Sequence, residues 1–434
     1  MEGYLNYNSN AYYVFMNYTL KTKVEEEKDD KPMTRSDYSD IHLGKEMTKK
    51  HFILVGFGDA GKKIFPALIQ FCRYFPRSLD ISIVDVKSLE VMLSEGLEKT
   101  LEDRFEKFSN LRLENDEIKK YLKILEKIYF VDEKPRDEEL IPKGLIPRID
   151  REEPIIVYLA VDPDLYLSAL KKYLHLGDIF VIEKPIAKDS KKAEELIKFI
   201  REKEEDLDKL FIPVDHYRGK KQVLDLVETI IKREDFYNKI KAANIIVFSL
   251  LEKRKPPTNT YFVSTGIIAD MMPHVLALLK KILNCKFDVE IKQVKSAFHK
   301  SFNKFKKYHP QYNETFAEME LFLIEEGGLT RTVIIRLGKG TPDEDRTVAF
   351  VDSNTNDYLK MKLKPLKDAG IYSISGGKQI KLELEVPKHM SSKWDNSWYN
   401  IIHELMHDEY DKFLTMEDAQ KFVEIIEKIK GMQK

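Results

Sequence analysis

The sequence lacks several features that would define its class at once. Its 434 residues include only two cysteines, Cys72 and Cys285, which are far apart and have no metal-ligand spacing. A disulfide framework is therefore not expected, and the reducing cytoplasm is the simplest setting. No run approaches the roughly 20 apolar residues of a membrane helix, and the N-terminus does not resemble a secretory signal. Glycine and proline number 18 and 17, too few for a collagen-like or low-complexity chain.

The sequence also has no excess of positive or negative residues. Lys and Arg number 72 against 73 Asp and Glu, which gives a formal net charge of −1. This balance gives no reason to expect a nucleic acid or a membrane as the partner. Hydrophobic residues make up 43% of the chain, and its length allows two or three domains at roughly 150 residues each. A soluble globular protein is the expected class.

The composition and the hydrophobic pattern of the chain change twice, which predicts three parts. Residues 1–48 are rich in Asn and Tyr and then almost wholly polar, which predicts a flexible extension. Residues 49–190 alternate short apolar runs with helical patterns, including a charged helix over 88–127, as is typical of a parallel, doubly wound α/β sheet. Residues 191–434 carry long β-rich runs between helices. They predict an α+β domain with a large, mainly antiparallel sheet.

A glycine-rich turn stands between the first predicted strand and the next helix. Its sequence, GFGDAGKK, contains GxGxxG. Glycine suits such a turn because the backbone approaches the pyrophosphate of a dinucleotide, whose charge the helix N-terminus stabilises. Asp85 ends the second strand, where a carboxylate would accept from the adenosine ribose hydroxyls. An ordinary strand-to-helix turn is the alternative. The residues expected at the cofactor are Gly56, Gly58, Asp59, Gly61, Lys62 and Asp85.

The same segment is also similar to a P-loop. Gly56 to Lys63 has the pattern GxxxxGKK, one residue away from that of nucleotide hydrolases. A P-loop needs Ser or Thr after its Lys because that hydroxyl ligates Mg²⁺. Lys63 stands there and cannot supply the ligand, so nucleotide hydrolysis is the weaker interpretation.

A zinc-protease pattern lies near the C-terminus. His403, Glu404 and His407 form HExxH on a predicted helix, which would place both imidazoles on one face beside a carboxylate. Nothing marks out a third ligand, and the pattern arises easily by chance in a chain rich in Glu that contains ten His. We therefore expect two ordinary helix histidines and no metal site.

The segment DHYRGK carries a cluster of hydrogen-bond donors. It runs from Asp215 to Lys220, between an apolar run and a predicted helix. Tyr217 and Lys220 are expected to share one face of the first helical turn. Together with His216 they would suit a phosphate at a helix N-terminus. A polar cap of the helix is the alternative.

Two further residues are candidates for chemistry. Lys184 stands at the end of a predicted buried strand, and the carboxyl ends of such strands face the crevice where α/β proteins bind ligands. An ordinary surface lysine is the alternative. His274 follows the segment GIIADMMP in a predicted amphipathic helix. Since the pKa of imidazole lies near neutrality, His274 is a candidate general base if a carboxylate orients it.

Taken together, these segments resemble the glucose-6-phosphate dehydrogenase family. VDHYRGK, VIEKP and YFVSTGIIAD…H are similar to the family's DHYxGK, EKPxG and YFDExGIIRD…NH, in the same order and at similar separations. YLAVDP resembles its YLALPP, RLGKG its RxGK, and NSWYNIIHELMHDEYDKF its DAYERLLxD helix, which accounts for the HExxH pattern without zinc. The resemblance spans roughly residues 50–430.

The resemblance implies an activity. It implies a Rossmann domain, NAD or NADP as cofactor, and oxidation of C1 of a hexose 6-phosphate to the 6-phosphogluconolactone, as in the pentose phosphate pathway. The expected partner is a small sugar phosphate, and the expected assembly is a dimer or tetramer built through the large sheet.

The resemblance also implies a role for each matching residue. His274 would be the general base, Asp215 its carboxylate partner and Lys184 a bridge between sugar and nicotinamide. The residues that would bind the 6-phosphate are His216, Tyr217 and Lys220. The residues that would face the sugar are Glu252, Asp270 and Lys339.

The sequence departs from the family at several places, two of which bear on the cofactor and on the candidate base. Members that prefer NADP tend to carry Arg just after the second strand, whereas Asp85 would repel a 2′-phosphate. NAD is therefore expected, with Lys87 leaving NADP open. Before His274, the usual Asn is replaced by Pro273, which is expected at a helix start. Two alternatives follow: another NAD-dependent sugar or sugar-phosphate dehydrogenase, or a catalytically silent homologue that binds a sugar phosphate or nucleotide.

Overall fold

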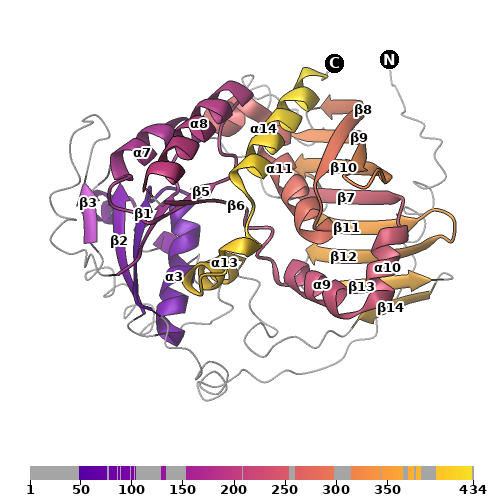
Figure 1. Cartoon of the computed structure of the whole chain (residues 1–434), viewed down its shortest axis with the longest axis horizontal. Helices are drawn as coiled ribbons and strands as arrows, with labels where there is room; N and C mark the ends of the chain where they lie inside the picture. The colour runs from indigo at the N-terminus through magenta and orange to yellow at the C-terminus, as the bar shows by residue number, and fades with distance from the viewer. Residues whose placement is uncertain are drawn as a thin grey trace.

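The computed structural model contains two sheets that lie side by side (Figure 1). It describes residues 48–75, 78–85, 87, 89–97, 99–101, 103, 129–132, 153–207, 209–253, 260–297, 314–342, 344–364, 370–375, 378–382 and 397–432. Nearly all of the extension predicted over 1–48, and most of the helix predicted over 88–127, lie outside these residues. The predicted fold class is confirmed, because a parallel α/β unit is followed by a unit with a large, mainly antiparallel sheet.

Sheet A is parallel and has the strand order β3-β2-β1-β4-β5-β6. Its strands are β1 (Lys50–Val55), β2 (Leu79–Asp85), β3 (Tyr129–Asp132), β4 (Ile155–Leu159), β5 (Ile179–Glu183) and β6 (Leu210–Val214). Every residue of β1, β4 and β5 is buried, as expected of strands covered on both faces. The strand order reverses between β1 and β4, and such a reversal is where ligands bind at the carboxyl ends of the strands.

Helices cover both faces of sheet A (Figure 1). One face packs against α3 (Gly61–Tyr74) and α13 (Ser397–Met406), and the other against α7 (Tyr166–Tyr173), α8 (Ser190–Leu207) and α14 (Met416–Gly431). The short elements α4 (Leu89–Ser94), η2 (Pro163–Leu165) and η6 (Tyr410–Lys412) complete this unit. The C-terminal segment therefore returns to the first sheet. The domain division at residue 190 stays a prediction, and β6, which lies beyond it, pairs with β5.

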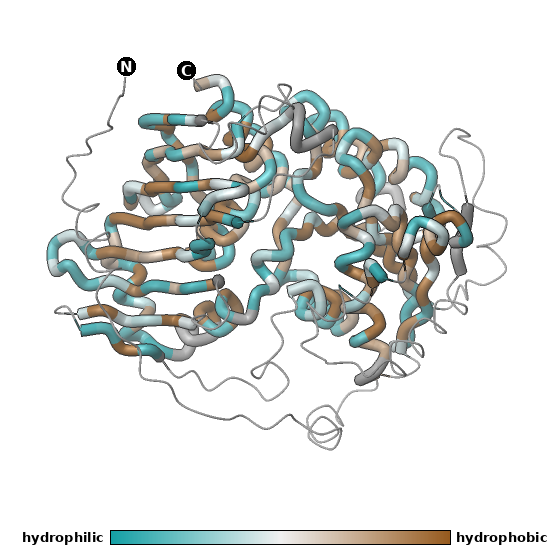
Figure 2. The backbone as a smooth tube through the Cα atoms, turned by 180° about the vertical axis from the view of Figure 1, so that it is seen from behind, coloured by the Kyte–Doolittle hydropathy of each residue, from teal (hydrophilic) through white to brown (hydrophobic). Residues whose placement is uncertain are grey.

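Sheet B has the strand order β14-β13-β12-β11-β7-β10-β9-β8, antiparallel except for the pair β7–β10. Its strands are β7 (Ile245–Glu252), β8 (Phe287–Ala297), β9 (Phe316–Glu325), β10 (Thr330–Lys339), β11 (Asp345–Asp352), β12 (Asp357–Lys364), β13 (Gly370–Ser375) and β14 (Lys378–Leu382). Burial alternates along β9 and β10, and Figure 2 shows hydrophobic and hydrophilic residues alternating along the strands. The buried side chains pack under α9 (Lys221–Lys232), α10 (Glu234–Ala242), α11 (Thr260–Leu283) and α14.

Both cysteines are free, which agrees with the expected lack of disulfides. Burial raises the pKa of the Cys72 thiol to about 12, so this side chain is an inert part of the packing beneath sheet A. Among the residues that the structure describes, no helix has both the length and the apolar composition needed to cross a bilayer.

The side chain of Lys50 connects β1 to the C-terminal end of α13. Its side chain is only 1% exposed, and Nζ donates to the carbonyl oxygens of Leu405 and Met406 at 3.1 Å each. The same nitrogen lies 2.6 Å from Oδ1 of Asp408. A cation at a helix C-terminus satisfies carbonyls that have no partner within the helix and complements the helix dipole.

We expect Lys50→Met to lower the free energy of unfolding by about 1–3 kcal/mol, because it removes charge-assisted hydrogen bonds from buried carbonyl groups. The neighbouring variant Lys49→Met is the control. Lys49 is only partly buried, and its ion pairs with Asp80 and Glu153 contribute less than about 1 kcal/mol. Urea unfolding followed by circular dichroism measures both variants. An equal loss in the two would show that the contact with α13 is not what Lys50 contributes.

Candidate functional site

The glycine turn lies at the carboxyl end of β1, beside a cavity of about 330 Å³. Gly56 has a φ of 92°, and a Cβ added there would lie 2.7 Å from the carbonyl oxygen of Ala160. A Cβ on Gly61 would lie 2.3 Å from the carbonyl oxygen of Gly56. Both positions therefore require glycine. Gly58 lines the cavity, and its Cβ would meet no atom within 4 Å, so its backbone is open to a ligand.

Asp85 faces the same cavity from the end of β2. Its Oδ2 accepts from the backbone N–H of Phe57 at 2.6 Å, and its Oδ1 accepts from that of Lys87 at 3.0 Å. The carboxylate thus fixes the glycine turn as well as facing the cavity. Each carboxylate oxygen has two acceptor sites, which leaves room for the hydroxyl groups of a ribose.

The other residues predicted at the cofactor have different surroundings. The ammonium of Lys87 lies 2.7 Å from both carboxylate oxygens of Glu95. Asp59 is exposed and pairs with Lys63 at 2.5 Å, four residues along the chain. Lys62 is half-buried in the first turn of α3. The cavity walls thus contain Gly56, Gly58 and Asp85 from the predicted set.

A second cluster centres on His274 and Asp215. Nδ1 of His274 lies 2.9 Å from Oδ1 and 2.8 Å from Oδ2 of Asp215, and both side chains are buried. Burial lowers the pKa of His274 well below its usual value, with Lys184 adding to the effect, and burial raises the pKa of Asp215. The imidazole is therefore neutral near pH 7. The contact with Asp215 assigns the proton to Nδ1 and leaves Nε2 as an acceptor.

The second half of α11 places His274. Gly266 has a φ of 78° and divides the helix in two, and Glu314 caps the second part through Ile267 N–H at 3.1 Å and Ile268 N–H at 3.2 Å. The prediction that Pro273 starts a helix is wrong, because Pro273 lies inside this second part. Gly266 and the Glu314 carboxylate set the start of this second part instead.

DHYRGK forms a turn before α9, which begins at Lys221. The prediction that Tyr217 and Lys220 share the first helical turn is therefore wrong. The two side chains still meet, because Nζ of Lys220 lies 5.3 Å from the centroid of the Tyr217 ring. The Tyr217 ring also stacks on His274 at 4.1 Å, and that of His216 meets His274 edge-on at 4.7 Å.

Trp398 was not recognised as part of the site from the sequence. It opens α13 and stacks on His216 with ring centroids 5.1 Å apart. The only signal for it was the resemblance of its helix to a family helix, since more than 180 residues separate it from His216 along the chain. Trp398 joins the C-terminal segment to the cluster around His274.

Asp270 contacts two lysines, Lys184, which directly follows β5, and Lys339, which ends β10. Nζ of Lys184 donates to the Asp270 carbonyl oxygen at 2.7 Å and lies 3.7 Å from its Oδ1. Nζ of Lys339, at the end of β10, hydrogen-bonds to Oδ2. Burial alone would raise the pKa of Asp270, but the two ammonium groups outweigh it and hold the pKa well below its usual range. The structure therefore brings these three predicted residues together.

Arg346 connects Glu252, the last of the residues predicted to face the sugar, to the cluster around His274. Its guanidinium lies 3.2 Å from Glu252 and 3.0 Å from Glu344, and donates to the Tyr217 hydroxyl at 3.3 Å. Although burial opposes it, these partners hold the pKa of Arg346 above its usual range. Its Nε is buried without an acceptor among the described residues. Sequence reasoning missed Arg346, whose only signal was its place at the start of the strand that follows RLGKG.

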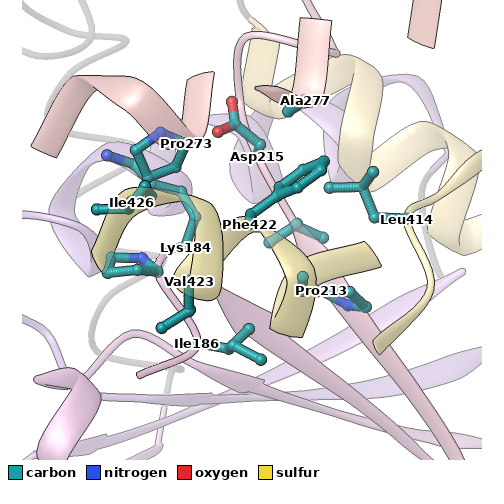
Figure 3. Close-up of a pocket in the computed structure, with 13 residues that line it drawn as sticks. Lys184, Ile186, Pro213, Asp215, Pro273, Ala277, Leu414, Phe422, Val423 and Ile426 are labelled. Carbon is teal, nitrogen blue, oxygen red and sulfur yellow. The ribbon is translucent and has the colours of Figure 1, made fainter. Parts of the chain in front are cut away.

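A small apolar cavity lies behind Lys184 and Asp215 (Figure 3). Its volume is about 20 Å³, near the minimum for one water molecule and far below that of a sugar. Pro273 and Ala277 of α11 line it together with apolar side chains of α14, namely Phe422, Val423 and Ile426. It is a packing gap rather than a binding site, and its walls keep the inner side of the Asp215 carboxylate away from bulk water.

The histidines of the HExxH pattern lie elsewhere. The rings of His403 and His407 stack at 4.0 Å and pack beside Phe71 and Phe75 in an aromatic cluster. His403 lies in α13, whereas His407 is in the turn that directly follows this helix. Glu404 is buried, which raises its pKa, and its charged neighbours include Lys281. Its surroundings are thus a cationic cluster rather than a metal centre.

Asp215, His216 and His274 have donor atoms within 4.8 Å of one another, a spacing that a divalent cation could use. The charges around them oppose this. Burial lowers the pKa of His274 most, and Lys184, Lys339 and Arg346 lower it further, against the opposing effect of Asp270. Burial and these three cations therefore disfavour positive charge at this imidazole. The cluster is better suited to an anionic ligand.

Comparisons with known proteins agree with this arrangement. Residues 53–225 match the family model described as "Glucose-6-phosphate dehydrogenase, NAD binding domain". No curated protein matches the chain. Glucose-6-phosphate 1-dehydrogenase from Mycobacterium avium is similar over 90% of this chain and 94% of its own, with a TM-score of 0.66 and 13% identity. A glucose-6-phosphate dehydrogenase in complex with its substrate covers 90% and 93%, with a TM-score of 0.64 and 16% identity.

A 3-ketoreductase from Actinomadura kijaniata, in complex with NADP and TDP-benzene, has the same fold. It is similar over 89% of this chain and 98% of its own, with a TM-score of 0.56 and 13% identity. At such identities the solved structures establish the fold alone. The family model covers the glycine turn, Lys184 and the DHYRGK turn, and it confirms a nicotinamide dinucleotide as the class of cofactor. Residues 53–225 thus match the NAD binding domain of the glucose-6-phosphate dehydrogenase family.

Proposed function

We propose that the protein oxidises C1 of a hexose 6-phosphate, glucose 6-phosphate first among them. The observation that supports this most directly is the pair of His274 and Asp215, buried beside the lysine at the end of β5. A bound nicotinamide supplies the hydride acceptor. A neutral imidazole whose Nε2 is an acceptor can take the hydroxyl proton as the hydride leaves C1.

The neighbouring residues would orient the sugar. Lys184 would bridge the sugar and the nicotinamide, since it stands at the carboxyl end of a strand in the NAD binding domain. Asp270 and Glu252 would accept from sugar hydroxyls, and Lys339 would donate to the sugar. Asp215 would hold the imidazole in the tautomer that accepts the proton and would stabilise the imidazolium that forms.

The 6-phosphate would bind at the DHYRGK turn. Lys220 is buried there beside the Tyr217 ring, and His216 lies between Trp398 and His274. Arg346 joins this group as a cation whose Nε lacks an acceptor among the described residues. Charge-assisted bonds to a phosphate are among the strongest polar contacts, so such a group favours a phosphorylated sugar over a neutral one.

The test is the appearance of reduced nicotinamide when the purified protein is given glucose 6-phosphate with NAD⁺ or NADP⁺ separately. Turnover would support the proposal. Turnover only with other sugars or sugar phosphates would favour a different dehydrogenase activity, for which the fold shared with a 3-ketoreductase is the motivating observation. Sugar-phosphate binding without reduced cofactor would indicate a silent homologue, as the altered segment before His274 suggests.

For the cofactor we propose a preference for NAD. Asp85→Ala should lower the ratio of kcat/KM with NAD⁺ to that with NADP⁺ about tenfold, because it removes a ribose acceptor and a charge that repels a 2′-phosphate. Asp85→Asn separates the two effects, since its amide oxygen can still accept from a ribose hydroxyl but the side chain carries no charge. Steady-state rates with both cofactors measure the ratio. An unchanged ratio in both variants would remove Asp85 from cofactor choice.

We also propose a dimer or tetramer assembled through sheet B. On β9 and β10 the residues that alternate with the core positions are half-buried and mix apolar with charged groups, among them Phe322 and Ile334. Ile334→Glu should therefore produce monomers in light scattering after gel filtration, and an unchanged mass would argue against this face. The free thiols agree with a reducing cytoplasm as the proposed compartment.

A further inference from the structure

The DHYRGK turn has two sides. On one side, Nζ of Lys220 lies 5.3 Å from the centroid of the Tyr217 ring, which stacks on His274. This side carries the groups that bind the phosphate in the proposed function. On the other side, Arg218 and Gly219 face the C-terminal segment and have no part in the proposed reaction. The phosphate-binding groups thus stand on a backbone whose reverse side packs against α13 and the residues that follow it.

The start of α13 approaches the backbone of the turn closely. Nδ2 of Asn400 donates to the carbonyl oxygen of Gly219 at 2.7 Å. A Cβ added to Gly219 would overlap the carbonyl oxygen of Ser397 and lie 3.0 Å from Cγ1 of Ile401. The turn therefore needs glycine at this position because the helix lies against it. The contact fixes the backbone of the residue directly before Lys220.

Two side chains of the turn are held by the same C-terminal segment. The ring of Trp398 stacks on that of His216, with 21° between the ring planes and 5.1 Å between the centroids. Arg218 is buried, and its guanidinium donates to the carbonyl oxygen of Lys412 and lies 5.9 Å from the centroid of the Phe413 ring. Because stacking fixes the plane of the imidazole, Trp398 also sets the directions in which the ring nitrogens of His216 point.

Helix α13 is itself held in place, so it can support the turn. It packs beside α3 (Figure 1), and its apolar side chains belong to the core beneath sheet A. The Trp398 ring meets Tyr158 of β4 edge-on at 6.3 Å, and the Tyr158 hydroxyl donates to Glu183 of β5 at 2.9 Å. At the other end of the helix, Lys50 donates to the last carbonyl groups. A rigid support keeps binding groups in their productive geometry and lowers the entropy lost when a ligand binds.

We propose that Asn400 and Trp398 are positioning residues, which hold the DHYRGK turn in the conformation that binds the phosphate of the substrate. They act through Gly219 and His216 and touch no reacting atom. This inference rests on the phosphate part of the proposed function. The phosphate is at the opposite end of the sugar from C1. Loss of either contact therefore weakens binding of the ground state and of the transition state alike, which raises KM and leaves kcat unchanged.

The test is calorimetric titration of Asn400→Ala with glucose 6-phosphate and, as a probe of the turn alone, with inorganic phosphate. No cofactor is added, so binding is measured without turnover. Loss of the hydrogen bond to Gly219 should raise both Kd values about 3–10-fold. In steady-state kinetics KM should rise by the same factor, while kcat stays within about twofold of that of the parent protein.

The matched control is Lys50→Met, which releases the C-terminal end of α13 and leaves its contacts with the turn in place. It should keep both Kd values of the parent protein, and circular dichroism shows that each variant is folded. Trp398 gives a second comparison. Trp398→Leu should weaken binding by a similar factor, whereas Trp398→Phe keeps a ring that stacks on His216 and should restore most of the affinity.

Three results would overturn the positioning role. They are unchanged affinity in Asn400→Ala or in Trp398→Leu, a loss of kcat at constant affinity, and an equal loss of affinity in Lys50→Met. Weaker binding in the variants, with no turnover by the parent protein, would support the positioning role and overturn only the proposed oxidation. If the parent protein binds neither glucose 6-phosphate nor inorganic phosphate, the phosphate assignment and the positioning role are both wrong.

Discussion

His274→Asn should lower kcat by about 10²–10⁴-fold while leaving the Kd of glucose 6-phosphate nearly unchanged. The asparagine keeps a polar group near Asp215 but has no nitrogen that can accept a proton from the C1 hydroxyl. Binding of the sugar phosphate rests on other side chains, namely those of the DHYRGK turn, which the substitution leaves in place. A loss in kcat with constant affinity therefore separates proton transfer from binding.

Steady-state kinetics measures kcat. The Kd of glucose 6-phosphate can be measured from the change in the fluorescence of Trp398, which stacks on His216. The matched control is His407→Asn, which alters a histidine that directly follows α13 and packs beside Phe75, outside the cluster. This control should keep the parent kcat. Near-normal turnover in His274→Asn would show that another group removes the proton.

Asp215→Asn should lower kcat by a similar factor, about 10²–10⁴-fold, although it removes no atom that would touch the sugar. The carboxylate accepts from Nδ1–H of His274 at both of its oxygens. An amide can instead donate to Nδ1, which moves the imidazole proton to Nε2 and blocks the acceptor that the reaction needs. The effect would thus come from the tautomer rather than from the loss of packing.

Double substitution tests this interpretation. Because both residues would serve one proton transfer, the double variant Asp215→Asn with His274→Asn should be no slower than the worse single variant. Losses that multiply would contradict a shared role. Asp178→Asn is the control, since Asp178 lies at the opposite end of β5 and accepts from the backbone N–H of Ile155 at 2.9 Å. It should leave kcat unchanged.

The local parts of the fold and site could be predicted from the sequence. The glycine turn after β1 and Asp85 at the end of β2 belong to a strand–turn–helix–strand unit that is contiguous in the chain. Apolar runs marked the buried strands of sheet A, because such strands are covered on both faces. His274 and Lys184 were candidates from their places in the sequence, and the family resemblance added their specific roles toward the sugar and the nicotinamide.

The parts that depend on long-range pairing could not be predicted. Arg346 reaches Glu252 because β11 pairs with β7, and the sequence alone does not specify that pairing. The bond between Tyr158 and Glu183 likewise needs β4 beside β5. The error at Pro273 has a local cause. A proline is tolerated inside the second part of α11, whose start is set by Gly266 and by a carboxylate from a distant segment.

The contact between Lys50 and α13 bears on how the protein is made. It joins β1 to residues about 355 positions later, and α13 and α14 cover opposite faces of sheet A. During translation, the first strands leave the ribosome long before these two helices exist. The part of the apolar surface of the sheet that these two helices cover is therefore exposed until they are synthesised, and it is a target for chaperones. The cofactor domain can therefore reach its final state only after α13 and α14 have been synthesised.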